Sequence, residues 1–178
     1  MAQTILVTGG SRSGKSGYAQ ARAENCRGRK LFVATCPRID GEMDERIANH
    51  KLERQGKNWH TIEEETHLAK IIDDNYASEV LLIDCLTLWV NNLLYNAQDA
   101  IECVDEDRIR RLCDDILLAS YRHPGVIFFV TNEIGSGIVP EDSATRRYRD
   151  LVGRCNQCIA QGAEEVVLVS CGIPLQLK

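Results

Sequence analysis

A short apolar segment, Ile5-Leu6-Val7-Thr8, leads directly into Gly9-Gly10-Ser11-Arg12-Ser13-Gly14-Lys15-Ser16. The second segment fits the pattern G-x-x-x-x-G-K-[ST], and good helix formers follow it from Tyr18 to Glu24. Strand, loop and helix therefore come in the order that a phosphate-binding loop requires. A glycine-rich turn that binds nothing would not need a lysine and a serine directly after its last glycine. The segment indicates nucleotide binding.

The chemistry of such a loop assigns a task to each part of it. Its glycines let backbone N–H groups close around phosphate oxygens, and the following helix adds the positive end of its dipole. Lys15 is expected to reach the β- and γ-phosphates, and the Ser16 hydroxyl is expected to bind Mg²⁺. The predicted contacts are Gly9, Gly10, Ser11, Arg12, Ser13, Gly14, Lys15 and Ser16.

Length and charge limit the possible classes of protein. A chain of 178 residues suits one domain, residues 1–178, and its net charge of −5 with scattered Lys and Arg does not indicate a nucleic-acid-binding face. The first apolar run is too short for a signal peptide. The longest apolar stretch, Val80–Tyr95, is interrupted by Asp84, Asn91 and Asn92, so we expect no membrane span. These features favour a cytoplasmic protein.

Eight cysteines are present, and we interpret them as small buried hydrophobic residues in a reducing compartment. Cys155 and Cys158 form a C-x-x-C, but they lie in a helical pattern without a second pair at zinc-ribbon spacing. A metal or redox role is therefore not expected for them.

Short apolar blocks alternate with helical patterns along the chain, which favours an α/β fold with a mainly parallel sheet and helices on both faces. The predicted strands are Thr4–Thr8, Leu31–Ala34, Val80–Asp84, Val126–Thr131 and Val166–Ser170. The predicted helices are Lys15–Cys26, Glu42–Arg54, Leu68–Asn75, Leu86–Asn96, Glu106–Tyr121 and Ala144–Gln161. Residues 172–177 are typical of a tight turn and a short antiparallel edge strand.

Ligands of such folds bind at the carboxyl ends of the strands. The residues at these ends are Gly9–Ser16, Thr35-Cys36, Asp84 and Thr131-Asn132-Glu133. Asp84 closes an apolar strand with a carboxylate, as expected of an acidic residue that helps to hold Mg²⁺. The alternative for Asp84 is a helix cap. For Asn132 and Glu133, positioning of nucleotide or metal and a structural role in their loop both stay open.

Other phosphate-binding folds fit less well. A dinucleotide-binding fold requires G-x-G-x-x-G and an acidic end to the second strand, but that strand ends in Ala34-Thr35-Cys36. A switch GTPase would carry Asn-Lys-x-Asp where this chain has Thr131-Asn132-Glu133-Ile134. A kinase of a small molecule stays possible.

One predicted helix carries a possible nucleophile. Arg46, His50 and Arg54 follow one another at i,i+4 spacing and share a helix face. Neighbouring cations lower the pKa of a histidine, which leaves a neutral imidazole that can attack phosphorus. The alternative is a solvated helix face with an incidental histidine.

Several sequence motifs, taken together, resemble those of the bifunctional adenosylcobinamide kinase / adenosylcobinamide-phosphate guanylyltransferase family of cobalamin synthesis. The phosphate loop is generic, whereas the long phrase Thr131–Glu141 is specific, and the resemblance covers essentially the whole chain. The matching phrases are Gly9–Ser16, His50-Lys51-x-x-Arg54, Trp59-x-Thr61-x-Glu63-Glu64, Thr131–Glu141, Arg147-Tyr148-Arg149-Asp150 and Gly153-x-x-Asn156-Gln157.

The resemblance implies two reactions. The enzyme phosphorylates the aminopropanol hydroxyl of adenosylcobinamide with ATP or GTP, and then transfers GMP from GTP to that phosphate through a guanylylated His50. It also implies a RecA-like phosphate-loop fold, a homotrimer and further nucleotide contacts. These contacts map onto Ala34, Thr35, Cys36, Lys51, Leu52, Glu53, Arg54, Glu63 and Asp84. A carboxylate such as Glu63 is able to accept hydrogen bonds from guanine.

Three departures from the family pattern bear on the site. Cys36 replaces a common serine, Gln55-Gly56 replaces a proline, and one residue is inserted before Trp59. Two other hypotheses stay open: a phosphate-loop kinase of another small alcohol, and a RecA-related regulatory subunit that binds nucleotide.

Overall fold

Parallel strands dominate the fold. The computed structural model describes residues 3–37, 56–97 and 103–178. Within these ranges seven strands form one sheet in the order β3-β2-β4-β5-β1-β6-β7. They are β1 (Gln3–Thr8), β2 (Lys30–Ala34), β3 (Trp59–Glu63), β4 (Val80–Asp84), β5 (Val126–Val130), β6 (Glu165–Ser170) and β7 (Ile173–Gln176). Strands β1 to β6 pair in parallel and β7 pairs antiparallel with β6, which confirms the predicted α/β class and its antiparallel C-terminal edge strand.

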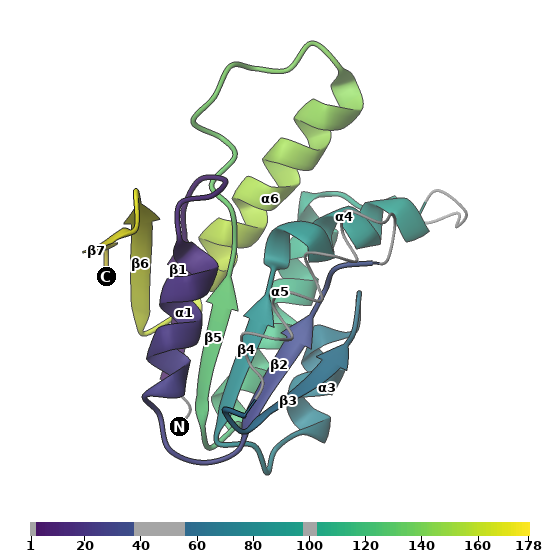
Figure 1. Cartoon of the computed structure of the whole chain (residues 1–178). Coiled ribbons are helices and arrows are strands. Elements are labelled where there is room, and N and C mark those ends of the chain that lie inside the picture. The colour runs from purple at the N-terminus through teal and green to yellow at the C-terminus, as the bar shows by residue number, and fades with distance from the viewer. Residues whose placement is uncertain (1–2, 38–55, 98–102) are drawn as a thin grey trace.

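Helices cover both faces of the sheet (Figure 1). They are α1 (Lys15–Glu24), α3 (Leu68–Asp74), α4 (Leu86–Asn96), α5 (Glu106–Arg122) and α6 (Ser143–Gly162). Successive strand residues point to opposite faces, so each apolar strand contributes to two cores. Leu82 and Phe128 pack on the α1 side with Ala19, whereas Ile83 and Phe129 pack among α3, α4, α5 and α6.

One strand of the sheet was not predicted from the sequence, and one predicted helix lies outside the described residues. The missed strand is β3, whose sequence Trp-His-Thr-Ile-Glu has no apolar block. It lies at the edge of the sheet, where its side chains are only partly covered, so the apolar pattern of a central strand is not needed there. The predicted helix Glu42–Arg54 lies outside the described residues.

The cysteines only partly follow the prediction. Cys85, Cys113, Cys155 and Cys158 are buried, but Cys103 and Cys171 are exposed, and none of the eight forms a disulfide. A hydrogen bond with Cys155, together with burial, raises the pKa of Cys113, so its thiol stays protonated between α5 and α6. In the described part of the chain, no helix is both long enough and apolar enough to span a bilayer.

Buried polar groups join the loops that follow β2 and β4. The Thr35 hydroxyl donates to the Cys85 carbonyl (2.8 Å) and accepts from the Cys85 N–H (2.7 Å). The side-chain amide of Asn92, on α4, donates to the Thr35 carbonyl at 2.8 Å. Because no water reaches Thr35, each of these bonds satisfies a group that would otherwise be buried without a partner. The network fixes the loops relative to each other.

A similar network joins the end of β5 to α4 and α6. The Thr131 hydroxyl donates to the Asn156 side-chain oxygen at 2.7 Å, and the Asn156 amide donates to the Asn132 carbonyl at 3.0 Å. The Asn132 N–H donates to the Thr87 hydroxyl at 2.7 Å. Asn156 is thus a positioning residue to which the sequence analysis gave no role. The available signal was a polar residue beside the apolar face of a strongly amphipathic helix.

The start of β5 provides a steric test of the fold. A Cβ atom on Gly125 would lie 2.3 Å from the Glu79 carbonyl oxygen and 2.7 Å from its carbon, and both are backbone atoms. We expect Gly125→Ala to lower the free energy of unfolding by about 1–3 kcal/mol in urea denaturation. Gly153→Ala is the control: nothing lies within 4 Å of its added Cβ, so it should raise stability by about 0.5–1 kcal/mol. Equal urea midpoints for Gly125→Ala and the wild type would contradict the close approach.

The Thr35 network makes a second stability prediction. Thr35→Val keeps the shape of the side chain but leaves the Cys85 N–H and carbonyl without their partner, so we expect a loss of about 1–3 kcal/mol. Thr35→Ser keeps the hydroxyl, and it should be more stable than Thr35→Val when both are measured in the same denaturant series. A valine variant as stable as the serine variant would show that the hydroxyl does not join the two loops.

Candidate functional site

The phosphate loop is held in place by its neighbours on both sides. The Gly172 N–H, in the turn between β6 and β7, donates to the Ser13 carbonyl at 2.8 Å, and the Glu133 N–H donates to the Gly9 carbonyl at 3.0 Å. Gly14 has φ +92°, a left-handed conformation that favours glycine. A Cβ atom on Gly9 would lie 2.3 Å from the Val169 carbonyl oxygen, so only glycine fits there. The loop therefore has its shape before any ligand arrives.

Lys15 is the first residue of α1 and is buried, with 8% of its surface exposed. Its ammonium donates to the Gly10 carbonyl at 3.1 Å, so the side chain folds back over the loop. This places a positive charge at the helix N-terminus, where backbone N–H groups already favour anions. Ser16 follows on the first turn of the same helix. The loop, the lysine and the serine are thus brought together as the sequence predicts.

Asp84 lies on the same edge of the sheet, although β5 separates β4 from β1. Burial, with a further contribution from the Asp84 carboxylate, raises the pKa of the Cys85 thiol to about 11, while the Lys15 ammonium acts in the opposite direction. Asp84 and Lys15 therefore both lie close enough to act on one thiol. The N-cap of α4 is Cys85, which makes no side-chain cap hydrogen bond, so Asp84 does not occupy the N-cap position of that helix.

Residues from four strands form a row across the carboxyl edge. Glu63 pairs with Ala34, Ala34 with Asp84, and Asp84 with Val130. The structure thus aligns three predicted nucleotide contacts that are far apart in the sequence. Thr35 differs from the prediction in one respect, because its hydroxyl and its carbonyl are both bonded to neighbouring protein groups. The Cys36 side chain is partly exposed and donates to the Pro37 carbonyl at 3.4 Å.

The loop after β5 has a structural carboxylate. Glu133 accepts hydrogen bonds from the N–H groups of Gly135 (2.8 Å) and Ser136 (3.1 Å). Hydrogen bonding, led by the Ser136 side chain, lowers the pKa of the Glu133 carboxyl. Of the two roles left open for this residue, the contacts favour shaping of the loop.

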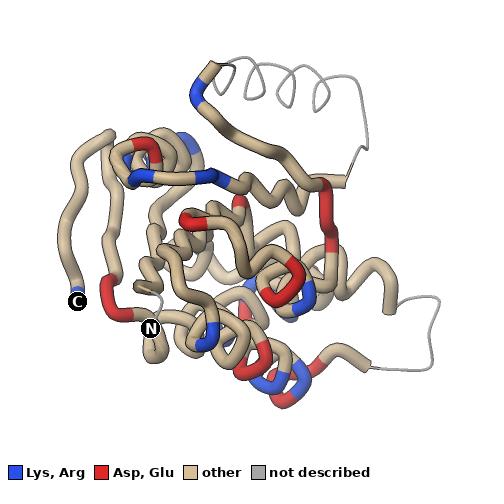
Figure 2. Tube along the Cα trace, turned by 90° about the horizontal axis from the view of Figure 1, so that it is seen from below, with Lys and Arg blue, Asp and Glu red and all other residues tan. Residues whose placement is uncertain are grey.

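Five predicted site residues lie outside the described residues: His50, Lys51, Leu52, Glu53 and Arg54. The described groups are a cradle of backbone N–H groups, a lysine, a serine hydroxyl and a strand-end carboxylate. Acidic and basic residues are interspersed along the described chain (Figure 2). The arrangement suits an anionic ligand bound at one end of the sheet, with hard oxygen donors beside it.

Comparison with known proteins agrees with this geometry. The family described as cobinamide kinase / cobinamide phosphate guanyltransferase matches residues 5–177. The bifunctional adenosylcobalamin biosynthesis protein CobU of Escherichia coli K12 is 40% identical over 98% of this chain and 99% of its own length. CobU of Salmonella typhimurium LT2 is 40% identical over 98% of this chain and 99% of its own length. CobP of Pseudomonas aeruginosa PAO1 is 38% identical over 97% of this chain and 96% of its own length.

A solved structure shows the same fold at low sequence identity. A KaiC-like protein from Pyrococcus horikoshii OT3 matches with a TM-score of 0.51 and 15% identity, covering 93% of this chain and 70% of that chain. The likeness supports a RecA-like phosphate-loop architecture and, at this identity, says nothing of activity. The extent of the sequence matches decides the family: this chain belongs to the cobinamide kinase / cobinamide phosphate guanyltransferase family.

Proposed function

We propose that this protein phosphorylates the aminopropanol hydroxyl of adenosylcobinamide and then transfers GMP from GTP to the new phosphate. The observation that carries the proposal is the family match over residues 5–177, which includes the preformed phosphate loop. The products are adenosylcobinamide-GDP and pyrophosphate. One protein performing both steps agrees with the relatives, whose names describe them as bifunctional.

In the first step the phosphate loop holds the triphosphate of ATP or GTP. The substrate hydroxyl attacks the γ-phosphorus and gives up its proton to solvent, the bond from that phosphorus to the β-bridging oxygen breaks, and the nucleoside diphosphate leaves. Lys15 and the loop N–H groups stabilise the charge that gathers on the phosphate oxygens. Their value depends on being oriented in advance, and the hydrogen bonds from Gly172 and Glu133 to the loop provide that orientation.

Mg²⁺ is the metal that this step requires, and the donors suit it. Ser16 supplies a hydroxyl and Asp84 a carboxylate, both hard oxygen ligands, and Mg²⁺ is commonly held by one or two carboxylates together with substrate phosphates. When bound, the ion neutralises phosphate charge. Asp84 ends β4 at the same carboxyl edge at which Lys15 begins α1, so a cation beside Asp84 would lie at the edge that holds the phosphates.

In the second step we assign His50 as the nucleophile. An imidazole nitrogen attacks the α-phosphorus of GTP, forming an N–P bond as the bond to pyrophosphate breaks. A phosphate oxygen of the acceptor then attacks the same phosphorus, and the N–P bond breaks to return the free imidazole. Support comes from the sequence, where His50 stands between Arg46 and Arg54 at helical spacing. Lys51, Leu52, Glu53 and Arg54 are proposed contacts of the same nucleotide.

Glu63 is our candidate for recognition of guanine, because its carboxylate can accept hydrogen bonds from guanine N1–H and N2–H. It ends β3, which is four strand spacings, about 19 Å, from β1. A nucleotide that contacts Glu63 therefore lies along the carboxyl edge and not over β1 alone. Ala34, Thr35 and Cys36 lie beside this path, and the backbone and the Cys36 side chain are the groups proposed to contact it. Family resemblance further suggests a homotrimer, and nucleoside triphosphate substrates suggest the cytoplasm.

Substitution separates the two steps. With adenosylcobinamide, Mg²⁺ and GTP, mass spectrometry of the wild-type products should show the mass gain of one phosphate and then that of GMP. We expect His50→Asn to keep phosphorylation and to lose GMP transfer by more than about 100-fold, because only the second step needs a covalent intermediate. Full transfer by His50→Asn would contradict the assigned nucleophile.

Lys15→Ala serves as the complementary variant. Both steps place phosphate charge on the same loop, so both rates should fall by about 100-fold to 1,000-fold. A Lys15→Ala enzyme that lost only one step would show that the other uses a different phosphate site. Absence of any corrinoid product from the wild type, with nucleotide still bound, would favour the regulatory hypothesis. Phosphorylation of another small alcohol alone would favour the simple kinase.

A further inference from the structure

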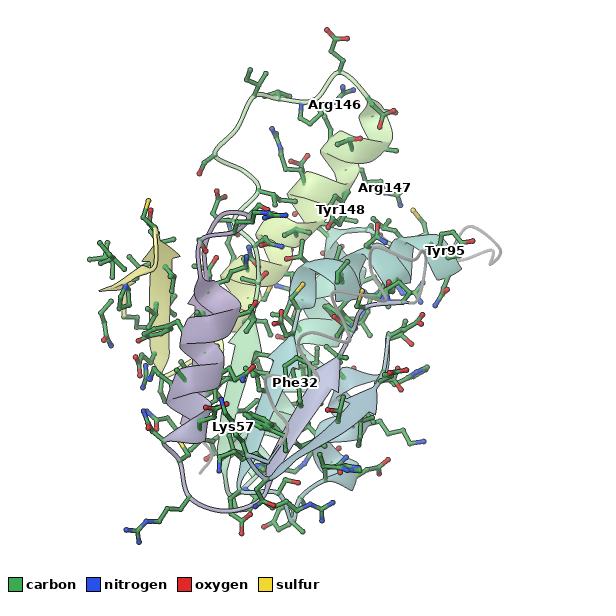
Figure 3. All side chains as sticks on the ribbon, viewed as in Figure 1. Phe32, Lys57, Tyr95, Arg146, Arg147 and Tyr148 are labelled. Carbon is green, nitrogen blue, oxygen red and sulfur yellow. The ribbon has the colours of Figure 1, made fainter. Side chains whose placement is uncertain are left out.

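The N-terminal half of α6 extends past the carboxyl edge of the sheet. None of its first eight residues, 143–150, is buried, and its buried residues run from Leu151 to Ile159. Figure 1 shows the first half projecting beyond the ends of the strands, next to the loop that leaves β5, and Figure 3 places Arg146, Arg147 and Tyr148 there. This part of the helix therefore stands over the edge that carries the proposed site.

Asn156 shows which face of α6 is turned toward the phosphate loop. It is bonded to the Thr131 hydroxyl (2.7 Å) and to the Asn132 carbonyl (3.0 Å), the two residues that follow β5. The next residue, Glu133, donates its N–H to the Gly9 carbonyl of the phosphate loop at 3.0 Å. The Asn156 face of the helix thus meets the junction between β5 and the phosphate loop.

Arg149 lies on this same face. It precedes Asn156 by seven residues. In an α-helix this spacing corresponds to a rotation within about 20° of two full turns and to a distance of about 10 Å along the axis. Helix side chains lean toward the N-terminus, so the Arg149 side chain extends beyond the strand ends. Gly153 stands between the two, and nothing lies within 4 Å of the position that a Cβ would take there. Arg149 therefore leaves the helix on the face that carries Asn156, and a Cβ atom on Gly153 of that face would meet open space.

Among the described residues, the neighbouring arginines have closer acceptors than Arg149 has. Arg146 donates to the Pro140 carbonyl at 2.9 Å, and Arg147 to the Val104 carbonyl at 2.7 Å. Arg154 forms a close ion pair with Glu106. The contact that the described residues give Arg149 is with Asp150 at 3.5 Å, at the limit of a hydrogen bond.

Burial makes this shortage of acceptors within the described ranges informative. Only 20% of the Arg149 side chain is exposed, against 58% for Asp150. The guanidinium is thus mostly covered, yet most of its five N–H donors have no acceptor among the described residues. A planar guanidinium suits phosphate, which it can bind through two parallel hydrogen bonds.

We propose that Arg149 binds a substrate phosphate group above the phosphate loop. The inference rests on the proposed function for the identity of the substrates. Two sources share this chemistry: the terminal phosphates of the nucleotide, and the phosphate of adenosylcobinamide phosphate. Either assignment makes Arg149 a substrate-binding residue in a segment separate from Gly9–Ser16.

Direct binding measurements test the proposal without requiring turnover. Calorimetry would compare the wild type, Arg149→Gln and the control Arg154→Gln with four ligands: GTP, GMP, adenosylcobinamide phosphate and adenosylcobinamide. Loss of a charge-assisted hydrogen bond predicts affinity that is about 10-fold to 100-fold weaker for the ligand whose phosphate Arg149 holds. Arg149→Lys keeps the charge without the planar fork and should lie between the wild type and Arg149→Gln.

The pattern of losses identifies the source. If Arg149 holds a nucleotide phosphate, Arg149→Gln lowers the affinity for GTP and leaves the affinity for GMP unchanged, because GMP lacks the terminal phosphates. If Arg149 holds the phosphate of the acceptor, the variant lowers the affinity for adenosylcobinamide phosphate and leaves the affinity for adenosylcobinamide unchanged. Unchanged affinity for all four ligands would overturn the proposal. So would an equal loss for GTP and GMP with a lowered Tm, or losses that Arg154→Gln reproduces, because these results mark a structural role.

The same experiment keeps this inference separate from the proposed function. A wild type that binds GTP but makes no corrinoid product refutes the function, and a selective loss of GTP affinity in Arg149→Gln would still support the phosphate contact. A wild type that performs both reactions, with Arg149→Gln unchanged toward every ligand, refutes the contact alone.

Discussion

Parallel pairing of β4 with β2 and β5 is the constraint on which the rest of the site depends. The pairing aligns Ala34, Asp84 and Val130 in one row, and each strand delivers its next residue to the same edge. The segments that follow the strands leave the regular hydrogen bonding of the sheet, so their buried polar groups need other partners. Thr35 supplies such a partner to Cys85, directly after β4, and the Thr131 hydroxyl bonds to Asn156 on α6. The sheet therefore brings the site residues together, and the buried hydroxyls hold them in place.

The phosphate loop benefits from the same arrangement. Its carbonyls accept hydrogen bonds from Gly172 on one side and Glu133 on the other, so elements near the C-terminus fix the geometry of a loop near the N-terminus. A loop held in this way does not have to reorganise when phosphate charge develops, which is the condition under which fixed dipoles stabilise a transition state most. Two successive phosphorus reactions on one edge, as proposed, would both draw on this preformed cradle.

Much of this architecture can be predicted from the sequence because it follows from local sequence patterns. The buried central strands are continuous apolar blocks, and the phosphate loop is a contiguous motif followed by a helix. The position of Asp84 at the carboxyl edge could be predicted, because a carboxylate at the end of such a block falls at the edge where ligands bind. By contrast, β3 was missed because an edge strand with partly covered side chains needs no apolar block. The exposure of Cys103 and Cys171 also depends on tertiary structure that local patterns do not express.

Long-range contacts explain the other differences. Thr35 was expected to contact nucleotide, but its partner Cys85 is fifty residues away, and no local pattern reveals that its hydroxyl is occupied. Asn156 and Arg149 matched the family pattern without an assigned role. The contacts of Asn156 with the residues after β5, and the role proposed for Arg149, depend on how α6 is placed at the edge of the sheet (Figure 1). Partner geometry, more than residue type, separates the structural polar residues from those proposed to bind substrate.

Covalent transfer through His50 can be tested by incubating the protein with Mg²⁺ and GTP labelled at the α-phosphate or, in parallel, at the γ-phosphate. A guanylylated His50 predicts acid-labile label on the protein from the α-position only, and none on His50→Asn. Such a result would establish a histidine–GMP intermediate. No α-label on the wild-type protein, or equal label on His50→Asn, would contradict the covalent transfer and leave the carboxyl edge with kinase chemistry alone.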